Sequence, residues 1–156
     1  MAGQIEHELE VNVHADVLWE IYGGLEFGRL AIRLLPKFFS SLEVIEGDGG
    51  VGTVLKLVFP EGAFLSYQKE KFTVIDNEKR LKVVEVIEGG FLELGFSFFR
   101  LYLQIIEKNP KSSIIKSTLE YEVKPGFEAN VSLVSAQNQV LVTIAEAITN
   151  YVAEKI

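Results

Sequence analysis

The chain has 156 residues, of which 48% are hydrophobic and 24% are charged, and its formal net charge is −7. This length and composition are typical of a globular chain with a sizeable core, so we expect residues 1–156 to form a single domain. The acidic balance argues against nucleic acid or an anionic membrane surface as a partner, because both need a basic face. No cysteine is present, which excludes disulfides, zinc–thiolate sites and cysteine nucleophiles.

The N-terminal third begins with a strand and continues with two short helices. Residues 8–13 alternate strictly between polar and apolar side chains, which indicates a half-buried strand. Residues 16–22 carry apolar side chains at helical spacing and are followed by Gly23 and Gly24, which end the helix. A second short helix is expected over residues 26–35, because Pro36 stops it.

The middle of the chain reads almost entirely as strands and turns. The runs 42–45, 53–59, 67–75, 81–87, 91–106 and 113–123 are separated by glycine, proline or Asp–Asn turns. Successive strands joined by short turns form an antiparallel meander. Residues 130–156 then repeat apolar side chains at i, i+3, i+4 and i+7, which predicts one long amphipathic helix.

This order of elements predicts an α+β fold in which a curved, seven-stranded antiparallel sheet grips the long C-terminal helix. A curved sheet that is closed only by a helix often leaves a cavity between the two layers. We therefore expect an internal hydrophobic cavity. No apolar run approaches the roughly 18–20 residues of a membrane span, and the first six residues show no signal-peptide pattern.

One glycine-rich segment matches the sequence of a nucleotide-binding motif but lacks the structural context that the motif needs. Residues 47–52 satisfy G-x-G-x-x-G, but a dinucleotide site needs a helix to follow the loop. Residues 53–59 alternate like a strand instead, which favours a hairpin loop whose glycines supply positive φ. The nucleotide site remains the minor alternative, because no helix N-terminus would receive the phosphates.

The two histidines, His7 and His14, give no sign of a metal site. No carboxylate or second histidine stands at ligand spacing from either, so we predict no metal. His7 shares strand parity with Leu9 and Val11 and could face inward, where a structural role is the more common one.

Residues 67–82 read as strand, tight turn and strand, and they carry the candidate chemistry. Gln68, Glu70 and Phe72 share one face of the first strand, and Lys82 shares a face of the next strand with Val84. If these faces are buried, Glu70 and Lys82 lie in an apolar interior, where they could move protons near neutral pH. A cross-strand ion pair on a solvated face is the alternative.

The segment 91–102 is unusually aromatic. By parity, Phe91, Phe99 and Leu101 share one face, and Phe96, Phe98 and Arg100 share the other, unless a bulge at Gly95 exchanges the faces. Each aromatic side chain can be explained as core. A pocket that stacks a planar ligand is expected for some of them.

Several motifs together resemble the birch-pollen-allergen, or pathogenesis-related class 10, family. The glycine-rich hairpin at 46–53 resembles the family's glycine-rich loop. The stretches 67–72, 76–82, 87–95 and 117–125 resemble the norcoclaurine synthase branch of the family, so the resemblance covers essentially the whole chain.

The resemblance implies a cytoplasmic plant protein with a deep apolar cavity. Norcoclaurine synthases join dopamine to 4-hydroxyphenylacetaldehyde by a Pictet–Spengler condensation, and the related norbelladine synthase condenses tyramine with a benzaldehyde. The lysine of these synthases that matches Lys82 is a base toward a phenolic hydroxyl. The glutamate that matches Glu70 shuttles protons as the carbinolamine and the iminium form.

Two positions depart from the synthase pattern. Gln68 stands where the synthases place a tyrosine at the cavity mouth, and Tyr67 lies one residue earlier on the other parity. A register shift would be needed to turn Tyr67 inward. Leu101 stands where an aspartate helps to hold the amine substrate, which makes the cavity more apolar.

We therefore expect a lyase of plant alkaloid biosynthesis that condenses an arylethylamine with an aromatic aldehyde without a cofactor, as a monomer or weak dimer. Its expected catalytic residues are Lys82, Glu70 and Tyr67, and its expected substrate-binding residues are Gln68, Phe72, Phe91, Phe99 and Leu101. The alternative is a non-catalytic carrier of a hydrophobic plant metabolite or hormone. A weaker alternative is an interaction module that uses the strand 91–102 as its interface.

Overall fold

A single antiparallel sheet of seven strands forms the body of the molecule, in the order β1-β7-β6-β5-β4-β3-β2. The computed structural model describes residues 1–155. In chain order the elements are β1 (Ala2–Val11), α1 (Ala15–Tyr22), α2 (Glu26–Leu34), β2 (Ser41–Glu46), β3 (Val54–Val58), β4 (Tyr67–Asp76), β5 (Leu81–Gly89), the 3-10 turn η1 (Gly90–Leu94), β6 (Phe96–Asn109), β7 (Ser112–Val123), η2 (Glu128–Val131) and α3 (Ser132–Glu154).

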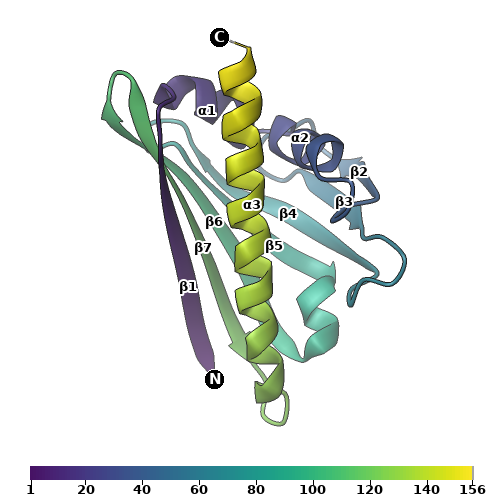
Figure 1. The fold of residues 1–156 in the computed structure, drawn as a ribbon. Helices are drawn as coiled ribbons and strands as arrows, with labels where there is room; N and C mark the ends of the chain where they lie inside the picture. Colours follow the sequence, from purple (N-terminus) through teal and green to yellow (C-terminus); the bar gives the residue numbers. More distant parts are fainter. Residues whose placement is uncertain (156) are drawn as a thin grey trace.

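The long helix α3 lies across the concave face of the sheet, and α1 and α2 lie beside its C-terminal half (Figure 1). Its buried side chains recur at the spacing of one helix face, namely Val134, Leu141, Ile144, Ala145, Ile148 and Val152. The segment Glu128–Glu154 is long and apolar enough to cross a membrane by length and composition alone, a test that the core helix of a soluble protein also passes. The predicted α+β architecture is confirmed.

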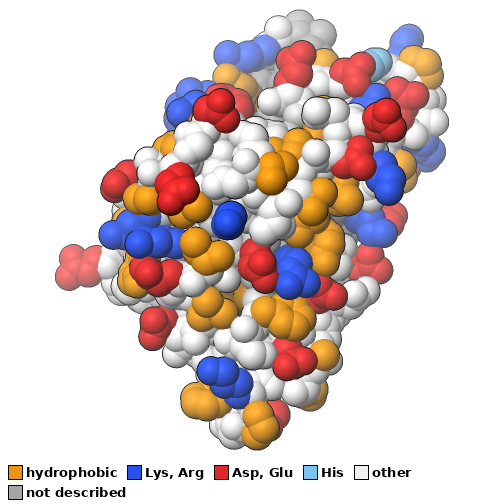
Figure 2. Space-filling view, turned by 180° about the vertical axis from the view of Figure 1, so that it is seen from behind, with side chains coloured by type: hydrophobic (Ala, Val, Ile, Leu, Met, Phe, Trp, Pro, Cys, Tyr) orange, Lys and Arg blue, Asp and Glu red, His pale blue; other side chains and the backbone are white. Residues whose placement is uncertain are grey.

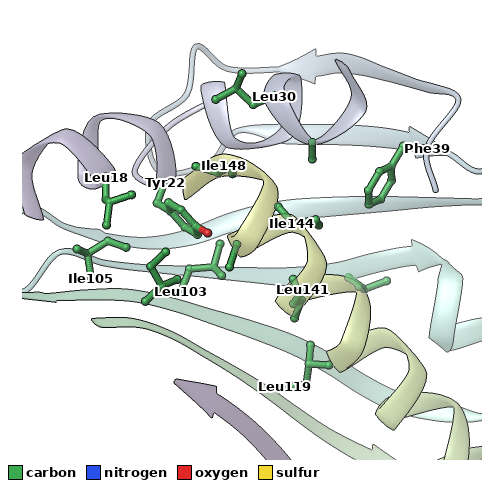
Figure 3. Packing of buried hydrophobic residues seen from close by; sticks show 14 of the residues in the cluster. Leu18, Tyr22, Leu30, Phe39, Leu103, Ile105, Leu119, Leu141, Ile144 and Ile148 are labelled. Carbon is green, nitrogen blue, oxygen red and sulfur yellow. The ribbon is translucent and has the colours of Figure 1, made fainter. Parts of the chain in front are cut away.

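The core is concentrated where α1, α3 and the middle of the sheet meet. Leu18 and Tyr22 of α1 point toward Leu103 and Ile105 of β6, and Ile148 of α3 closes the space above them (Figure 3). All five side chains are fully buried. This packing fixes α1 and α3 against the middle of the sheet.

The aromatic segment does not form one continuous strand. The predicted strand 91–106 is wrong at its start, because residues Gly90–Leu94 form a 3-10 turn and β6 begins at Phe96. Gly89, Gly90 and Gly95 all adopt positive φ, and these glycines allow the chain to leave β5 and re-enter the sheet in a tight turn.

Phe96 lies inside the molecule, which contradicts its expected place on the same face as Phe98. The register between β6 and β7 shifts between Phe96 and Phe98, so Ser97 is the extra residue of a bulge. The bulge allows both Phe96 and Phe99 to point inward, and their ring centroids are 5.9 Å apart. The sequence suggested a bulge near this point but placed it at Gly95.

The glycine-rich segment 47–52 is the hairpin loop between β2 and β3. Gly47, Gly49 and Gly52 have positive φ, and the backbone N–H of Gly49 donates to Thr53 Oγ1 at 2.9 Å. Strand β3 follows the loop directly, so no helix N-terminus stands after this loop to receive a phosphate. The hairpin interpretation is confirmed.

The opposite face of the sheet is covered by charged side chains of both signs, with apolar side chains between them (Figure 2). Arg100 donates hydrogen bonds to Glu85 and Glu120, each at 2.9 Å, and so links three neighbouring strands across this outer face. The sheet therefore has one solvated face and one apolar face, as antiparallel sheets commonly do.

Ile148 tests the contribution of α3 to stability. Its side chain is 0% exposed, and an Ile148→Ala substitution should lower the free energy of unfolding by about 2–5 kcal/mol, because it removes buried methyl groups and leaves a cavity. Urea denaturation measures the change. Glu146→Ala on the exposed side of α3 is the control and should change stability by at most about 0.5 kcal/mol. Equal effects of the two substitutions would contradict the packing described above.

Candidate active site

Two adjacent strands place the candidate catalytic side chains on the apolar face of the sheet. On β4, Gln68 and Phe72 are buried and the side chain of Lys71 between them is exposed. On β5, Lys82 is buried, and Phe72 pairs with Val84. The alternation of buried and exposed side chains expected from the sequence is seen on β4, whereas on β5 Val83 is buried as well.

A cavity lies between this face of the sheet and the helices α2 and α3. The cavity has a volume of about 70 Å³, which is several times the ~10–15 Å³ that one water molecule needs. Its walls are mostly apolar. The residues that line it include Phe27, Ala31, Phe39, Leu55, Phe59, Gln68, Glu70, Phe72, Lys82, Val84, Val86, Phe99, Leu101, Leu103, Leu119, Gln137, Leu141 and Ile144. The expected internal cavity is therefore present.

Lys82 places an amine in this apolar interior, and few polar groups offset the cost of removing that amine from water. The residue is 1% exposed, and its Nζ donates one hydrogen bond to the backbone carbonyl of Gly24 at 3.0 Å. The ring of Phe72 lies under the amine, with its centroid 4.3 Å from Nζ, and the ring of Phe27 lies 5.4 Å away. Burial lowers the pKa of Lys82 to about 8, although the attraction of Glu70 opposes the change.

Glu70 faces the same cavity from β4. Its Oε2 accepts a hydrogen bond from Gln68 Nε2 at 2.7 Å. Its side chain retains some accessible area, and because Glu70 lines the cavity we assign this area to the cavity surface. Burial raises the pKa of Glu70 above its usual value, against the hydrogen bond from Gln68 and the attraction of Lys82.

The two ionisable groups do not form a close ion pair. Among residues 1–155, the ion pairs with a nitrogen–oxygen distance of 4.0 Å or less include neither Glu70 nor Lys82. Their attraction therefore acts across the cavity, and desolvation remains the larger effect on both pKa values. The alternative of a solvated cross-strand ion pair does not agree with this geometry.

Tyr67 does not reach the cavity, although the sequence analysis placed it among the catalytic residues. Its hydroxyl donates to Glu88 Oε2 at 3.0 Å, and the amine of Lys56 lies 5.2 Å from its ring centroid. At the register shift that follows Lys69, the extra residue is Ile87 of β5, so the alternation along β4 is not interrupted and Tyr67 keeps its outward parity. The expected inward turn of Tyr67 is absent from this structure.

The expected binding residues divide into two groups. Phe72, Phe99 and Leu101 line the cavity together with Gln68. Phe91 does not line it, because it sits on η1 and stacks on Phe99, with ring centroids 4.1 Å apart and an interplanar angle of 5°. Phe91 therefore supports the cavity wall from behind.

The residues that line the cavity from the helical side were not among the site residues predicted from the sequence. Phe27 and Ala31 come from α2, Gln137 and Leu141 come from α3, and Phe39 follows α2. Helical spacing gave a signal for Leu141 and for Ile144, since both belong to the apolar stripe of the last helix. Which residues meet Glu70 and Lys82 depends on how α2 and α3 cross the sheet, which the sequence pattern does not specify.

The site has the chemical character of an acid–base pair in an apolar chamber. With a pKa of about 8, Lys82 is neutral in about a quarter of the molecules at pH 7.5, so it can accept a proton. A carboxyl whose pKa is raised can donate one. Both groups are therefore displaced toward the states that proton transfer near neutral pH requires.

The buried amine should make stability depend on pH. The folded-state pKa of about 8 lies below the unfolded value of 10.5, so between these values the unfolded chain binds more protons and stability rises with pH. We expect the unfolding free energy of the native protein to increase by about 2 kcal/mol relative to Lys82→Met between pH 7 and 9.5. Urea denaturation at the two pH values measures this difference. Lys71→Met, which changes an exposed lysine of β4, should show no such trend, and a constant difference for Lys82→Met would contradict a lowered pKa.

Comparison with known proteins agrees with this geometry. The profile of the pathogenesis-related protein Bet v 1 family matches residues 1–155. Norbelladine synthase of Narcissus pseudonarcissus is 45% identical over 156 residues, which are 99% of this chain and 94% of that protein. S-norcoclaurine synthase 2 of Papaver somniferum is 44% identical over 153 residues, and the match spans 97% of this chain but only 66% of that relative.

A solved structure gives the same result in three dimensions. The norcoclaurine synthase from Thalictrum flavum in complex with dopamine and hydroxybenzaldehyde superposes with a TM-score of 0.86 at 41% identity, covering 99% of this chain and 88% of that one. The resemblance inferred from the sequence motifs is confirmed by all of these matches. The chain belongs to the pathogenesis-related protein Bet v 1 family.

Proposed function

We propose that this protein catalyses the condensation of an arylethylamine with an aromatic aldehyde. The observation that carries the proposal is the presence of a buried amine, Lys82, and a buried carboxyl, Glu70, in one apolar cavity. Relatives of 44–45% identity are a norbelladine synthase and an S-norcoclaurine synthase. A norcoclaurine synthase that shares the fold has been captured with dopamine and hydroxybenzaldehyde, which supports substrates of this class.

The groups in the cavity can support the first half of such a reaction, which is the formation of an iminium from the amine and the aldehyde. The amine nitrogen adds to the carbonyl carbon and gives a carbinolamine, which then loses water to form an iminium. Glu70, when protonated, would donate its proton to the departing hydroxyl, and as a carboxylate it would accept a proton from the nitrogen. Apolar walls would help by holding the two reactants together, since orientation can supply much of the rate enhancement of such a step.

Lys82 would serve the second half of the reaction. Its neutral amine would remove the phenolic proton of the arylethylamine, which makes the aromatic ring electron-rich. The ring carbon could then attack the iminium carbon and form a carbon–carbon bond, after which loss of a ring proton restores aromaticity. Every step is an addition, an elimination or a proton transfer, which an amine and a carboxyl can support.

A second candidate function, the binding of a hydrophobic metabolite without turnover, is favoured by Leu101. This side chain lines the cavity at the position where the synthase pattern has an aspartate. The lining includes one carboxylate, Glu70, so a substrate ammonium would have one anionic partner there. A more apolar cavity of this kind would also suit an uncharged ligand.

Turnover of dopamine or tyramine with aromatic aldehydes tests the proposal. Lys82→Met should lower kcat/KM at least about 100-fold, because the substitution removes the general base but preserves the shape of the side chain. In the native protein, kcat/KM should rise with pH and level off above about pH 8, because the neutral form of Lys82 is the active one. Product formation followed by chiral chromatography is the measurement.

The matched control is Lys71→Met, which alters an exposed lysine of the same hairpin and should preserve activity. Full stereoselective activity in Lys82→Met would remove Lys82 from the mechanism. An absence of turnover with every amine and aldehyde, together with displacement of an apolar fluorescent probe by candidate ligands, would identify the protein as a carrier.

A further inference from the structure

The side chain of Gln68 is buried and is hydrogen-bonded to Glu70. It is 7% exposed and lies two residues from Glu70 on the same face of β4. Its Nε2 donates to Glu70 Oε2 at 2.7 Å, which is a short, charge-assisted hydrogen bond when Glu70 is ionised. Gln68 therefore contacts the candidate proton shuttle directly.

The other side of the amide rests against the backbone of Gly90. A Cβ atom added to Gly90 would clash with Gln68 Oε1 and would lie 2.8 Å from Gln68 Cβ, so no larger residue fits there without displacing Gln68. Gly90 also has a φ of 55°, a conformation that side-chain-bearing residues rarely adopt. The amide is thus confined between the start of η1 and the carboxyl of Glu70.

This confinement gives the two oxygens of Glu70 different surroundings. Oε2 is occupied by Gln68, whereas Oε1 has no hydrogen-bond partner among residues 1–155. A carboxyl held in this way cannot rotate freely, and its second oxygen stays available for exchange of a proton with a molecule in the cavity. The amide donor also favours the ionised form of the carboxyl.

We propose that Gln68 is a positioning residue that fixes the carboxyl of Glu70 for proton transfer through Oε1, with Gly90 as the surface against which it is held. The inference rests on the proposed function of Glu70 as a proton shuttle. It differs from the expectation that Gln68 contacts the substrate, because Gln68 acts through Glu70.

The electrostatic surroundings of Glu70 are simple enough to test this idea. Lys82 on β5 is the other ionisable side chain among the described residues that line the cavity. Helix α2 contributes apolar residues such as Phe27 and Ala31, and α3 contributes the uncharged Gln137. Removing the Gln68 donor should therefore change the titration of Glu70 without interference from a third charge.

The substitution Gln68→Met removes the donor and preserves length and volume. The titration of the Glu70 carboxyl, followed by carbon-13 NMR, should move to higher pH, because the ionised form loses its hydrogen bond. With a productive amine–aldehyde pair, kcat should fall about tenfold and KM should change less than about twofold, and the limb of the pH profile that reports Glu70 should move in the same direction. Gln104→Met, the same chemical change on the outer face of β6, should alter neither quantity.

A second variant, Gly90→Ala, reaches the same carboxyl without changing Gln68. It should displace the amide and reproduce the shift in the Glu70 titration. If this variant does not fold, Gln68→Met alone decides. An unchanged Glu70 titration and an unchanged kcat in folded Gln68→Met would overturn the proposal. Because the NMR titration needs no turnover, it tests the hydrogen bond between Gln68 and Glu70 separately from the proposed catalytic function.

Discussion

The burial of one amine, that of Lys82, is the constraint on which the rest of the site depends. An ammonium in an apolar interior is costly unless it is paired, and here a backbone carbonyl and the face of a phenylalanine are its close partners. The result is a lysine whose pKa is lowered to about 8, at the wall of a mostly apolar cavity. The elements around it can be understood as the support for this arrangement.

That support comes from both layers of the fold. The loop between α1 and α2 supplies the Gly24 carbonyl, and the packing of α1 on β6 fixes this loop in place. Helix α3 buries its apolar stripe against the sheet, and this core offsets the cost of the polar groups in the cavity. The core and the cavity share residues, among them Leu103 of β6, Leu119 of β7 and Ile144 of α3. The packing that stabilises the fold therefore also forms part of the cavity wall.

Much of the site could be predicted from the sequence because strands have a strict period of two. The period put Gln68, Glu70 and Phe72 on one face, and the family resemblance favoured the inward orientation of that face, which the structure shows. The period of two no longer predicts which face a side chain occupies where the strand pairing is irregular, as it is at the bulge beside Phe96.

Other features of the site could not be predicted from the sequence pattern. Phe91 lies on the 3-10 turn and not on the cavity wall, and the Tyr67 side chain points outward to Glu88. The contacts of Gln68 with Gly90 and of Lys82 with Gly24 join residues distant in sequence, so tertiary packing alone creates them. Sequence motifs identified the residue types of the site, and the structure was needed to show how each is held.

The protonation of Lys82 is the most direct test of this account. Heteronuclear NMR of the folded protein, labelled on its lysine side chains and assigned with Lys82→Met, gives the titration midpoint of this one amine. The account predicts a midpoint near pH 8, well below those of the exposed lysines. A midpoint near the ordinary value of 10.5 would show that the amine is solvated and would contradict a buried base at this site.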